Sequence, residues 1–222
     1  MKGALKHKSE RPPKFAKAVA KRDIRAAIRI ARTDSSVHSL QLPTTYRYER
    51  ALHAAVRLKS VGLAKVLLDQ GMDVDIPDGR GFTPLFLAPE LYSRLSVVEL
   101  LVERGADIHF QNDGALWSAI WQASYGYGNT LSMVHFLAKS GSKPRGLCHS
   151  AEAGNLKVAK LVIGLGADVN EVDQNGRTPL DYCTGIAHTW QFKTGQHHPR
   201  VAACLRQHGA VNGSELKAAV KK

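Results

Sequence analysis

The sequence lacks the features that mark membrane-spanning and secreted proteins. Its 222 residues contain no run of eighteen apolar residues, so we predict no transmembrane helix. The first fourteen residues are mostly polar and basic and do not form the apolar core of a signal peptide. Cysteine is scarce: Cys148, Cys183 and Cys204 match no paired metal motif and leave an odd count. We therefore expect an intracellular protein of the reduced cytoplasm, with no membrane partner.

The sequence also lacks the short patterns that assemble catalytic groups. Ser118, Ser150 and Cys148 are not preceded by the strand and turn that expose a nucleophile. The glycine pairs at 79–81 and 126–128 are too short for a phosphate-binding loop, and no strand is evident before them. We therefore predict that the chain is not an enzyme, with no catalytic residue and no cofactor.

Histidine and cysteine do gather near the C-terminal end, around an insertion at 186–199. Residue types that bind zinc occur there as His188, His197 and His198, near Asp181, Cys183, Cys204 and His208. Their spacing matches no compact metal motif, so we interpret the insertion as a polar loop. A metal protein or enzyme centred on residues 181–208 is the alternative.

Positive charge is concentrated at the N-terminal end. The net charge is +12, and residues 1–32 carry eleven lysines and arginines against Glu10 and Asp23. Such an end attracts nucleic acid, acidic protein surfaces or anionic lipid. A solvated cap that aids solubility explains the same charge, as does a cleaved presequence. Phe15 is the one aromatic residue in this segment, so base stacking is not indicated.

Short motifs recur along the rest of the chain. A glycine that ends a helix recurs at Gly71, Gly105, Gly141, Gly166 and Gly209, at intervals of 34, 36, 25 and 43 residues. A helix-start motif, in which threonine caps and proline takes the first position, recurs at 83–86 and 178–181. Degraded copies occur at 50–55, 118–121 and 147–148. Each unit is too small to bury its own apolar face, so it needs copies beside it.

These motifs resemble the ankyrin repeat family, in which T-P-L-H-x-A opens a helix pair and G-A-D-V-N closes it. The resemblance implies an all-α helical repeat solenoid with short β-hairpin or turn connections and about five to six helix pairs. The expected boundaries are a flexible basic lead at 1–13; an ankyrin repeat domain at 14–212, with a cap helix pair at 14–32 and repeats at 46–77, 78–112, 113–145, 146–173 and 174–212; and a C-terminal tail at 213–222.

Two irregularities stand out within this pattern. We expect residues 107–110 to leave the second helix pair in an extended segment. The interval of 25 residues before Gly166 is about eight short of the family period, so we predict a tight loop at 141–146 and a notch in the row of hairpins.

The resemblance also implies a concave groove that binds a protein partner, with the chain acting as a monomer. Candidate partner-binding residues are those at hairpin tips and on exposed sides of inner helices: Tyr46, Arg47, Arg57, Arg80, Phe82, Glu90, Trp117, Tyr125 and Arg177. We expect Phe82 and Trp117 to form an exposed apolar pair, because aligned positions face solvent in the family. Trp121 aligns with a buried position, and we expect it in the core. Nucleic-acid or acidic-surface binding by the basic end is the alternative function.

Overall fold

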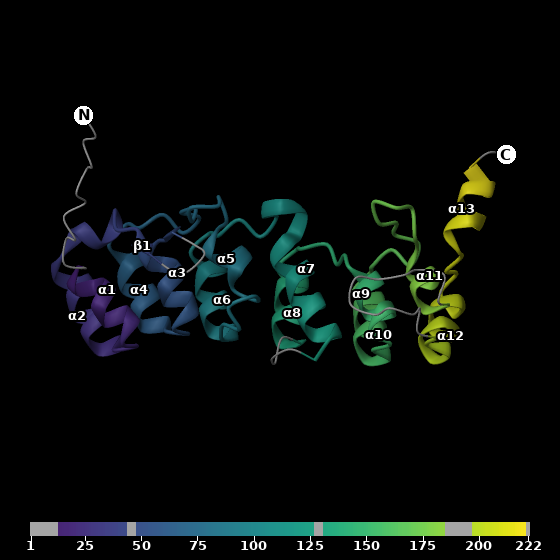
Figure 1. The fold of residues 1–222 in the computed structure, drawn as a ribbon, viewed down its shortest axis with the longest axis horizontal. Helices are drawn as coiled ribbons and strands as arrows, with labels where there is room; N and C mark the ends of the chain where they lie inside the picture. The colour runs from purple at the N-terminus through teal and green to yellow at the C-terminus, as the bar shows by residue number, and fades with distance from the viewer. Residues whose placement is uncertain (1–12, 44–47, 127–130, 185–196, 221–222) are drawn as a thin grey trace, which may run out of the picture.

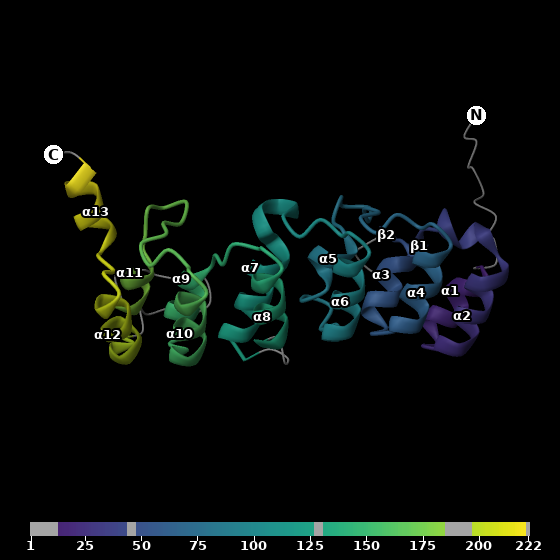
Figure 2. The ribbon, with the colours of Figure 1, turned by 180° about the vertical axis from the view of Figure 1, so that it is seen from behind.

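The computed structural model describes residues 13–43, 48–126, 131–184 and 197–220. Their helices stand side by side in one row (Figure 1, and from behind in Figure 2). The predicted basic lead at 1–13 lies outside the described residues apart from Pro13, as does most of the insertion at 186–199. The elements are α1 Lys14–Ala20, α2 Ile24–Thr33, η1 Ser35–His38, β1 Leu42–Pro43, β2 Tyr48–Glu49, α3 Ala51–Arg57, α4 Val61–Asp69, α5 Pro84–Leu87, α6 Leu95–Glu103, α7 Phe110–Ser124, α8 Leu131–Lys139, α9 Leu147–Glu152, α10 Leu156–Gly164, α11 Pro179–Cys183, α12 Pro199–Gln207 and α13 Gly213–Val220.

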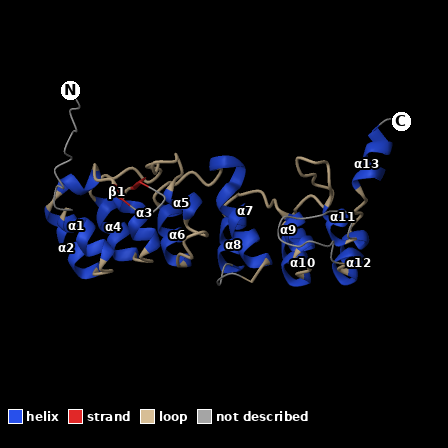
Figure 3. Ribbon diagram, viewed as in Figure 1, coloured by secondary structure: helices blue, strands red, loops and turns tan. Residues whose placement is uncertain are grey.

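The helices up to α12 pack as six consecutive pairs in the described part of the chain, and α13 follows the last pair. The predicted all-α repeat solenoid is therefore confirmed. The long connection before α3 contains a small antiparallel sheet, in which Leu42 lies opposite Glu49 and Pro43 opposite Tyr48 (Figure 3).

The helix boundaries follow from local sequence signals. The Thr83 hydroxyl accepts a hydrogen bond from the Phe86 N–H, and Pro84 takes the first position, where its missing N–H costs nothing. Gly105 and Gly166 have φ values of +86° and +92°, a conformation that side chains with a Cβ resist. The predicted cap at Thr83 and the predicted stops at these two glycines are confirmed.

The core runs along the whole row instead of forming a central ball. Each inner helix contributes an aliphatic residue with almost no exposed surface, for example Leu52, Leu85, Ile120 and Leu147. Burying such a side chain contributes about 1.5–3 kcal/mol, and most of that burial comes from the neighbouring repeats. The stack is therefore stabilised by contacts between repeats.

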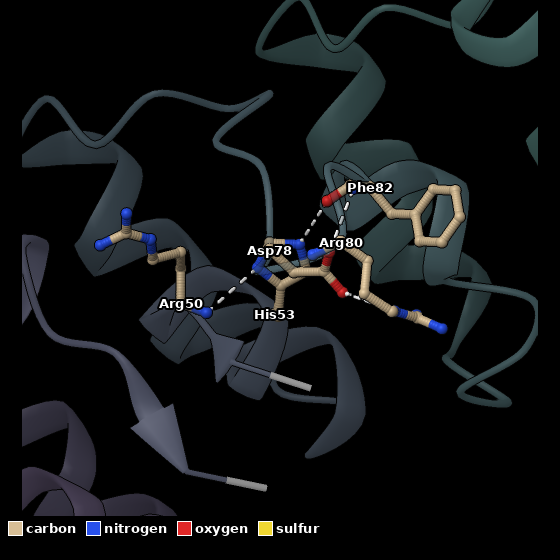
Figure 4. Close-up of polar contacts among 5 residues, drawn as sticks. All are labelled: Arg50, His53, Asp78, Arg80 and Phe82. Carbon is tan, nitrogen blue, oxygen red and sulfur yellow. Dashed lines mark hydrogen bonds and ion pairs between the residues drawn. The ribbon is translucent and has the colours of Figure 1, made fainter. Parts of the chain in front are cut away.

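A polar contact also joins two successive repeats (Figure 4). The imidazole of His53 is fully buried; its Nε2 donates to the Phe82 carbonyl oxygen at 3.0 Å, and its Nδ1 accepts from the Arg50 N–H at 3.4 Å. The carboxylate of Asp78 holds the receiving hairpin in shape, because it accepts the backbone N–H groups of Arg80 and Phe82 at 2.8 and 3.1 Å. His53 therefore fastens its own helix to the next hairpin.

Residues 107–110 differ from the expectation of an extended exit. Helix α7 already begins at Phe110 and runs for 15 residues. Ser118 and Ala119 stand where the preserved motif has threonine and proline. Without that proline nothing displaces the preceding residue from the helical region, so the helix extends toward the N-terminus.

The connection between α8 and α9 is as short as the 25-residue interval predicts. Residues 140–146 join the two helices directly, whereas residues 165–178 form a full-length connection from α10 to α11. The neighbouring outer helices α2 and α4, α4 and α6, α6 and α8, and α10 and α12 pack closely, but α8 and α10 pack less closely. The outer helices therefore lose close contact at this loop, while the inner helices α7 and α9 stay packed across it.

Candidate functional site

A groove opens where the short loop leaves a hairpin out of the row. One wall is the long helix α7, the floor is α9, and the other wall is the hairpin at 171–177. Its volume is about 990 Å³. We call it the notch groove, defined by Trp117, Trp121 and Tyr125 of α7, Cys148, His149 and Glu152 of α9, and residues 171–177.

Aromatic side chains on α7 face this groove. Trp117, Trp121 and Tyr125 are four residues apart, so they share one side of the helix. Trp117 packs edge-to-face against His149 of α9, with ring centroids 5.0 Å apart, and Trp121 lies 5.4 Å from Tyr125. The Trp117 side chain nevertheless stays 43% exposed. The His149 ring therefore holds the Trp117 side chain in place, while the exposed part of that side chain remains accessible to a ligand.

Two glycines allow these aromatic groups to approach the backbone. A Cβ at Gly114 would lie 2.4 Å from the ring of Phe86, which lines the groove beside α7. A Cβ at Gly146 would lie 3.1 Å from Trp117 Cδ1, and Gly146 has a φ of +90°. Side chains at these positions would displace the rings, so the glycines shape the wall.

The acidic groups of the groove are engaged within the protein. Glu171 accepts the backbone N–H groups of Gly146 and Cys148, both at 3.1 Å, and so caps α9 from the neighbouring repeat. Asp173 accepts the Tyr182 hydroxyl at 2.8 Å. By contrast, Arg145 at the edge is exposed and makes no ion pair or side-chain hydrogen bond within the described residues. The Arg145 guanidinium is therefore available to pair with an acidic or polar group of a ligand bound in the groove.

The titratable groups of the groove favour binding over nucleophilic chemistry. Burial raises the pKa of the Cys148 thiol far above its ordinary value, and the negative charges of Glu171 and Asp173 raise it further. Burial and the hydrogen bond to Asp173 likewise raise the pKa of the Tyr182 hydroxyl. A protonated thiol is a poor nucleophile at neutral pH.

The structure brings three of the nine predicted site residues together in the notch groove, namely Trp117, Tyr125 and Arg177. The Tyr125 hydroxyl bonds to Glu152 on the floor. Tyr46 and Arg47 lie outside the described residues.

The other predicted residues lie outside this groove. The Arg57 guanidinium pairs at 3.0 Å with Glu49, which is buried. Arg80 is exposed, and its guanidinium lies 4.7 Å above the centroid of the Phe82 ring. Glu90 is exposed near the turn between α5 and α6.

Two expectations about aromatic residues need correction. Phe82 is half-buried because its ring stacks on Phe86, with centroids 4.6 Å apart, so Phe82 and Trp117 do not form an exposed pair. Trp121 is also half-buried and lines the notch groove, whereas its aligned position predicted full burial. The missing hairpin explains this exposure, because it would have covered that side of the inner helices.

Sequence reasoning missed the floor of the groove. Cys148, His149 and Glu152 were not among the predicted binding residues, and neither was Arg145. The signal that could have found them is the 25-residue interval, since residues next to an absent hairpin lose its cover. The proposed zinc ligand His198 has another role: its Nε2 donates to the Glu152 carbonyl oxygen at 2.9 Å.

The described residues hold no group of three or more histidine, cysteine, aspartate or glutamate side chains placed to bind a metal ion. His188 lies outside the described residues. No helix in the described part of the chain is long and apolar enough to cross a membrane.

Two protein-family models match the chain. One, described as ankyrin repeats (3 copies), matches residues 18–112, and another, described as ankyrin repeats (many copies), matches residues 147–192. Together they cover more than half of the chain. Between them lie residues 113–146, which supply the α7 wall and Arg145.

Curated proteins similar to this chain are mostly much longer. The potassium channel AKT2/3 of Arabidopsis thaliana is 33% identical over 134 residues, which is 58% of this chain and 16% of the channel. Ankyrin repeat and SAM domain-containing protein 6 of Rattus norvegicus is 29% identical over 57% of this chain and 11% of its own length. The putative ankyrin repeat protein FPV223 of fowlpox virus is 28% identical over 55% of this chain and 89% of its own length.

A solved structure matches along most of the row. It is the ankyrin repeat domain of Bcl-3, with a TM-score of 0.68 and 20% sequence identity, covering 90% of this chain and 87% of that one. At this identity the likeness concerns the fold alone.

Proposed function

Because the chain belongs to the ankyrin repeat family, we propose that it is a non-catalytic module that binds a protein partner in the notch groove. Ankyrin repeats are in general protein-interaction scaffolds without enzymatic activity. Fold does not choose the partner, so the proposal depends on the site.

The observation that carries the proposal is where exposed apolar surface lies. Three large hydrophobic side chains are exposed in the described part of the chain, and two of them, Trp117 (43%) and Val172 (58%), line opposite walls of the notch groove. Exposed apolar groups that cluster in a depression mark interaction sites. Tryptophan and arginine also contribute most to binding energy at interfaces, and Arg145 and Arg177 line the same groove.

The groove is also held in shape before a partner arrives. Glu171 fixes the hairpin to the start of α9, and Tyr125 is tied to Glu152. Binding a partner therefore costs little free energy for ordering the side chains of the groove. An open groove of this size fits a loop or segment of another protein, which we expect to bind one copy of the chain in the cytoplasm.

The test begins with a partner recovered by affinity purification from the source cell and then purified. Calorimetry with Trp117→Ala should show affinity weakened at least about tenfold, because the variant lacks the exposed tryptophan side chain that the partner would bury. Tyr92→Ala is the matched control: Tyr92 is similarly exposed (45%) but lies at the turn after α5, outside the groove. Equal affinity for wild type and Trp117→Ala would show that the partner does not use the notch groove.

A further inference from the structure

The first helix pair carries an unusual density of unpaired positive charge. Residues 14–33 hold seven lysines and arginines, and all seven are exposed: Lys14, Lys17, Lys21, Arg22, Arg25, Arg29 and Arg32. Within the described residues none of them makes an ion pair or a side-chain hydrogen bond. We call this surface the basic end.

The nearby acidic groups offset only part of the positive charge of the basic end. Asp23 accepts the Ala26 N–H at 2.9 Å and caps α2, while Asp34 accepts the Ser36 N–H at 3.0 Å and caps η1. Both carboxylates hold backbone N–H groups but stay negatively charged, and Asp34 also attracts Lys14. Seven cations against two carboxylates leave residues 14–34 with a net charge of +5, which faces solvent.

The charges follow helical stripes. Arg25, Arg29 and Arg32 lie at i, i+4 and i+7 on α2, so they share one face over about 10 Å of helix axis. One strand of a nucleic-acid duplex presents a phosphate about every 3.4 Å along its axis, or about three over the same length. The stripe thus offers roughly as many cations as a strand offers phosphates.

The basic end has no apolar anchor. Phe15, Val19, Ala27 and Ala31 are buried, and α2 packs against α1 and α4. The exposed large hydrophobic side chains of the described residues lie elsewhere. A stable protein interface draws its energy from buried aromatic and apolar anchors, and an interfacial helix inserts an apolar face into lipid. The basic end offers neither, whereas contacts to phosphate need only positive charge.

We propose that the basic end binds the phosphate backbone of nucleic acid, without base recognition. No exposed aromatic side chain of α1 or α2 can stack on a base, so the contact is independent of sequence. The basic end and the notch groove lie in different parts of the row (Figure 1). The chain can therefore hold nucleic acid and a protein partner together, and each activity can fail without the other.

The test uses the full chain and two labelled 20-base-pair DNA duplexes of unrelated sequence, with binding followed by fluorescence anisotropy at several salt concentrations. We expect similar affinity for both duplexes. The triple variant Arg25→Gln, Arg29→Gln, Arg32→Gln should bind at least about tenfold more weakly at low salt. The slope of log affinity against log salt should shrink by about three, close to one for each lost phosphate contact.

The matched control is Lys143→Gln, Lys157→Gln, Lys160→Gln, which removes the same net charge from exposed positions far along the row. It should keep most of the affinity and the salt slope. Equal losses in the two triple variants would overturn the proposal, because net charge alone would then explain binding. Tighter binding to polyglutamate or to phosphatidylserine vesicles than to the duplexes would overturn it in favour of an acidic protein or a membrane. Circular dichroism checks that both variants keep the wild-type fold.

Discussion

Replacing His53 with alanine should weaken both the stack and the connection between its repeats. The imidazole is fully buried and makes two hydrogen bonds, one to its own helix start at Arg50 and one to the Phe82 carbonyl oxygen of the next repeat (Figure 4). Alanine leaves the part-buried Arg50 N–H without its partner and removes one of the two hydrogen bonds that the Phe82 carbonyl oxygen accepts, the other coming from the Asp78 N–H. It also leaves a cavity where the ring was, because close-packed neighbours relax only in part.

The size of the effect follows from these terms. Each lost hydrogen bond costs roughly 1 kcal/mol, and the cavity adds about 1–2 kcal/mol. We therefore expect a loss of about 3 kcal/mol in the free energy of unfolding, a large part of the 5–15 kcal/mol typical of a domain. Because the Phe82 contact joins two repeats, the dependence of unfolding on urea should also become shallower as cooperativity falls.

Urea denaturation followed by circular dichroism measures both quantities. His38→Ala is a suitable control, since His38 makes a single exposed contact at 3.4 Å to Gln70, and its loss should cost less than about 0.5 kcal/mol. A loss below about 1 kcal/mol for His53→Ala would refute the assignment of His53 as a fastening between repeats.

Two further predictions concern turns. Gly154→Ala should destabilise the fold by about 2 kcal/mol or more in thermal or urea unfolding, because Gly154 has a φ of +65° and a Cβ would lie 2.3 Å from the ring of His198. Lys59→Gly, at the same turn of an earlier repeat with a φ of +57°, should be neutral or stabilising; equal losses would contradict this reasoning. Burial opposes ionisation of Asp78, but two hairpin N–H groups outweigh it and hold its pKa below 3.8. The ionised Asp78 carboxylate therefore stabilises the fold fully above about pH 4, and this stabilisation is lost as the pH falls through the lower pKa of the folded state. The urea midpoint of Asp78→Asn should lie below that of the wild type, and the difference between the two midpoints should shrink between about pH 6 and pH 3. A difference that stays constant with pH would contradict this reasoning.

The sequence predicted those parts of the fold that local chemistry determines. Thr83 with Pro84 and the glycines at 105 and 166 act within a few residues of themselves, so their roles can be recognised without tertiary contacts. The start of α7 could not be predicted in this way. There the decisive feature is that Ala119 stands where the motif has proline. Without that proline the helix can extend toward the N-terminus, but the sequence does not indicate how far.

The candidate site was predicted in part. The short interval before Gly166 indicated the notch. Trp117, Tyr125 and Arg177 line the groove there, and their role in binding a partner stays a prediction. Cys148 and His149 were missed because their exposure depends on a hairpin that is absent just before α9, and no residue of their own marks that absence. The exposure of Phe82 was overestimated because its ring stacks on Phe86. Phe86 stands where the repeat motif has a polar residue, so the motif gave no sign of this contact.

The loop at 140–146 also has a mechanical consequence. It lies where α8 and α10 pack less closely than the other neighbouring outer helices. Across this loop the fourth and fifth helix pairs are joined mainly by α7, which packs against both α9 and α10. The walls of the notch groove stand on either side of this junction, with α7 before it and residues 171–177 after it. A movement of the last two helix pairs relative to α7 would therefore change the width of the groove, and a partner that fills the groove would oppose that movement.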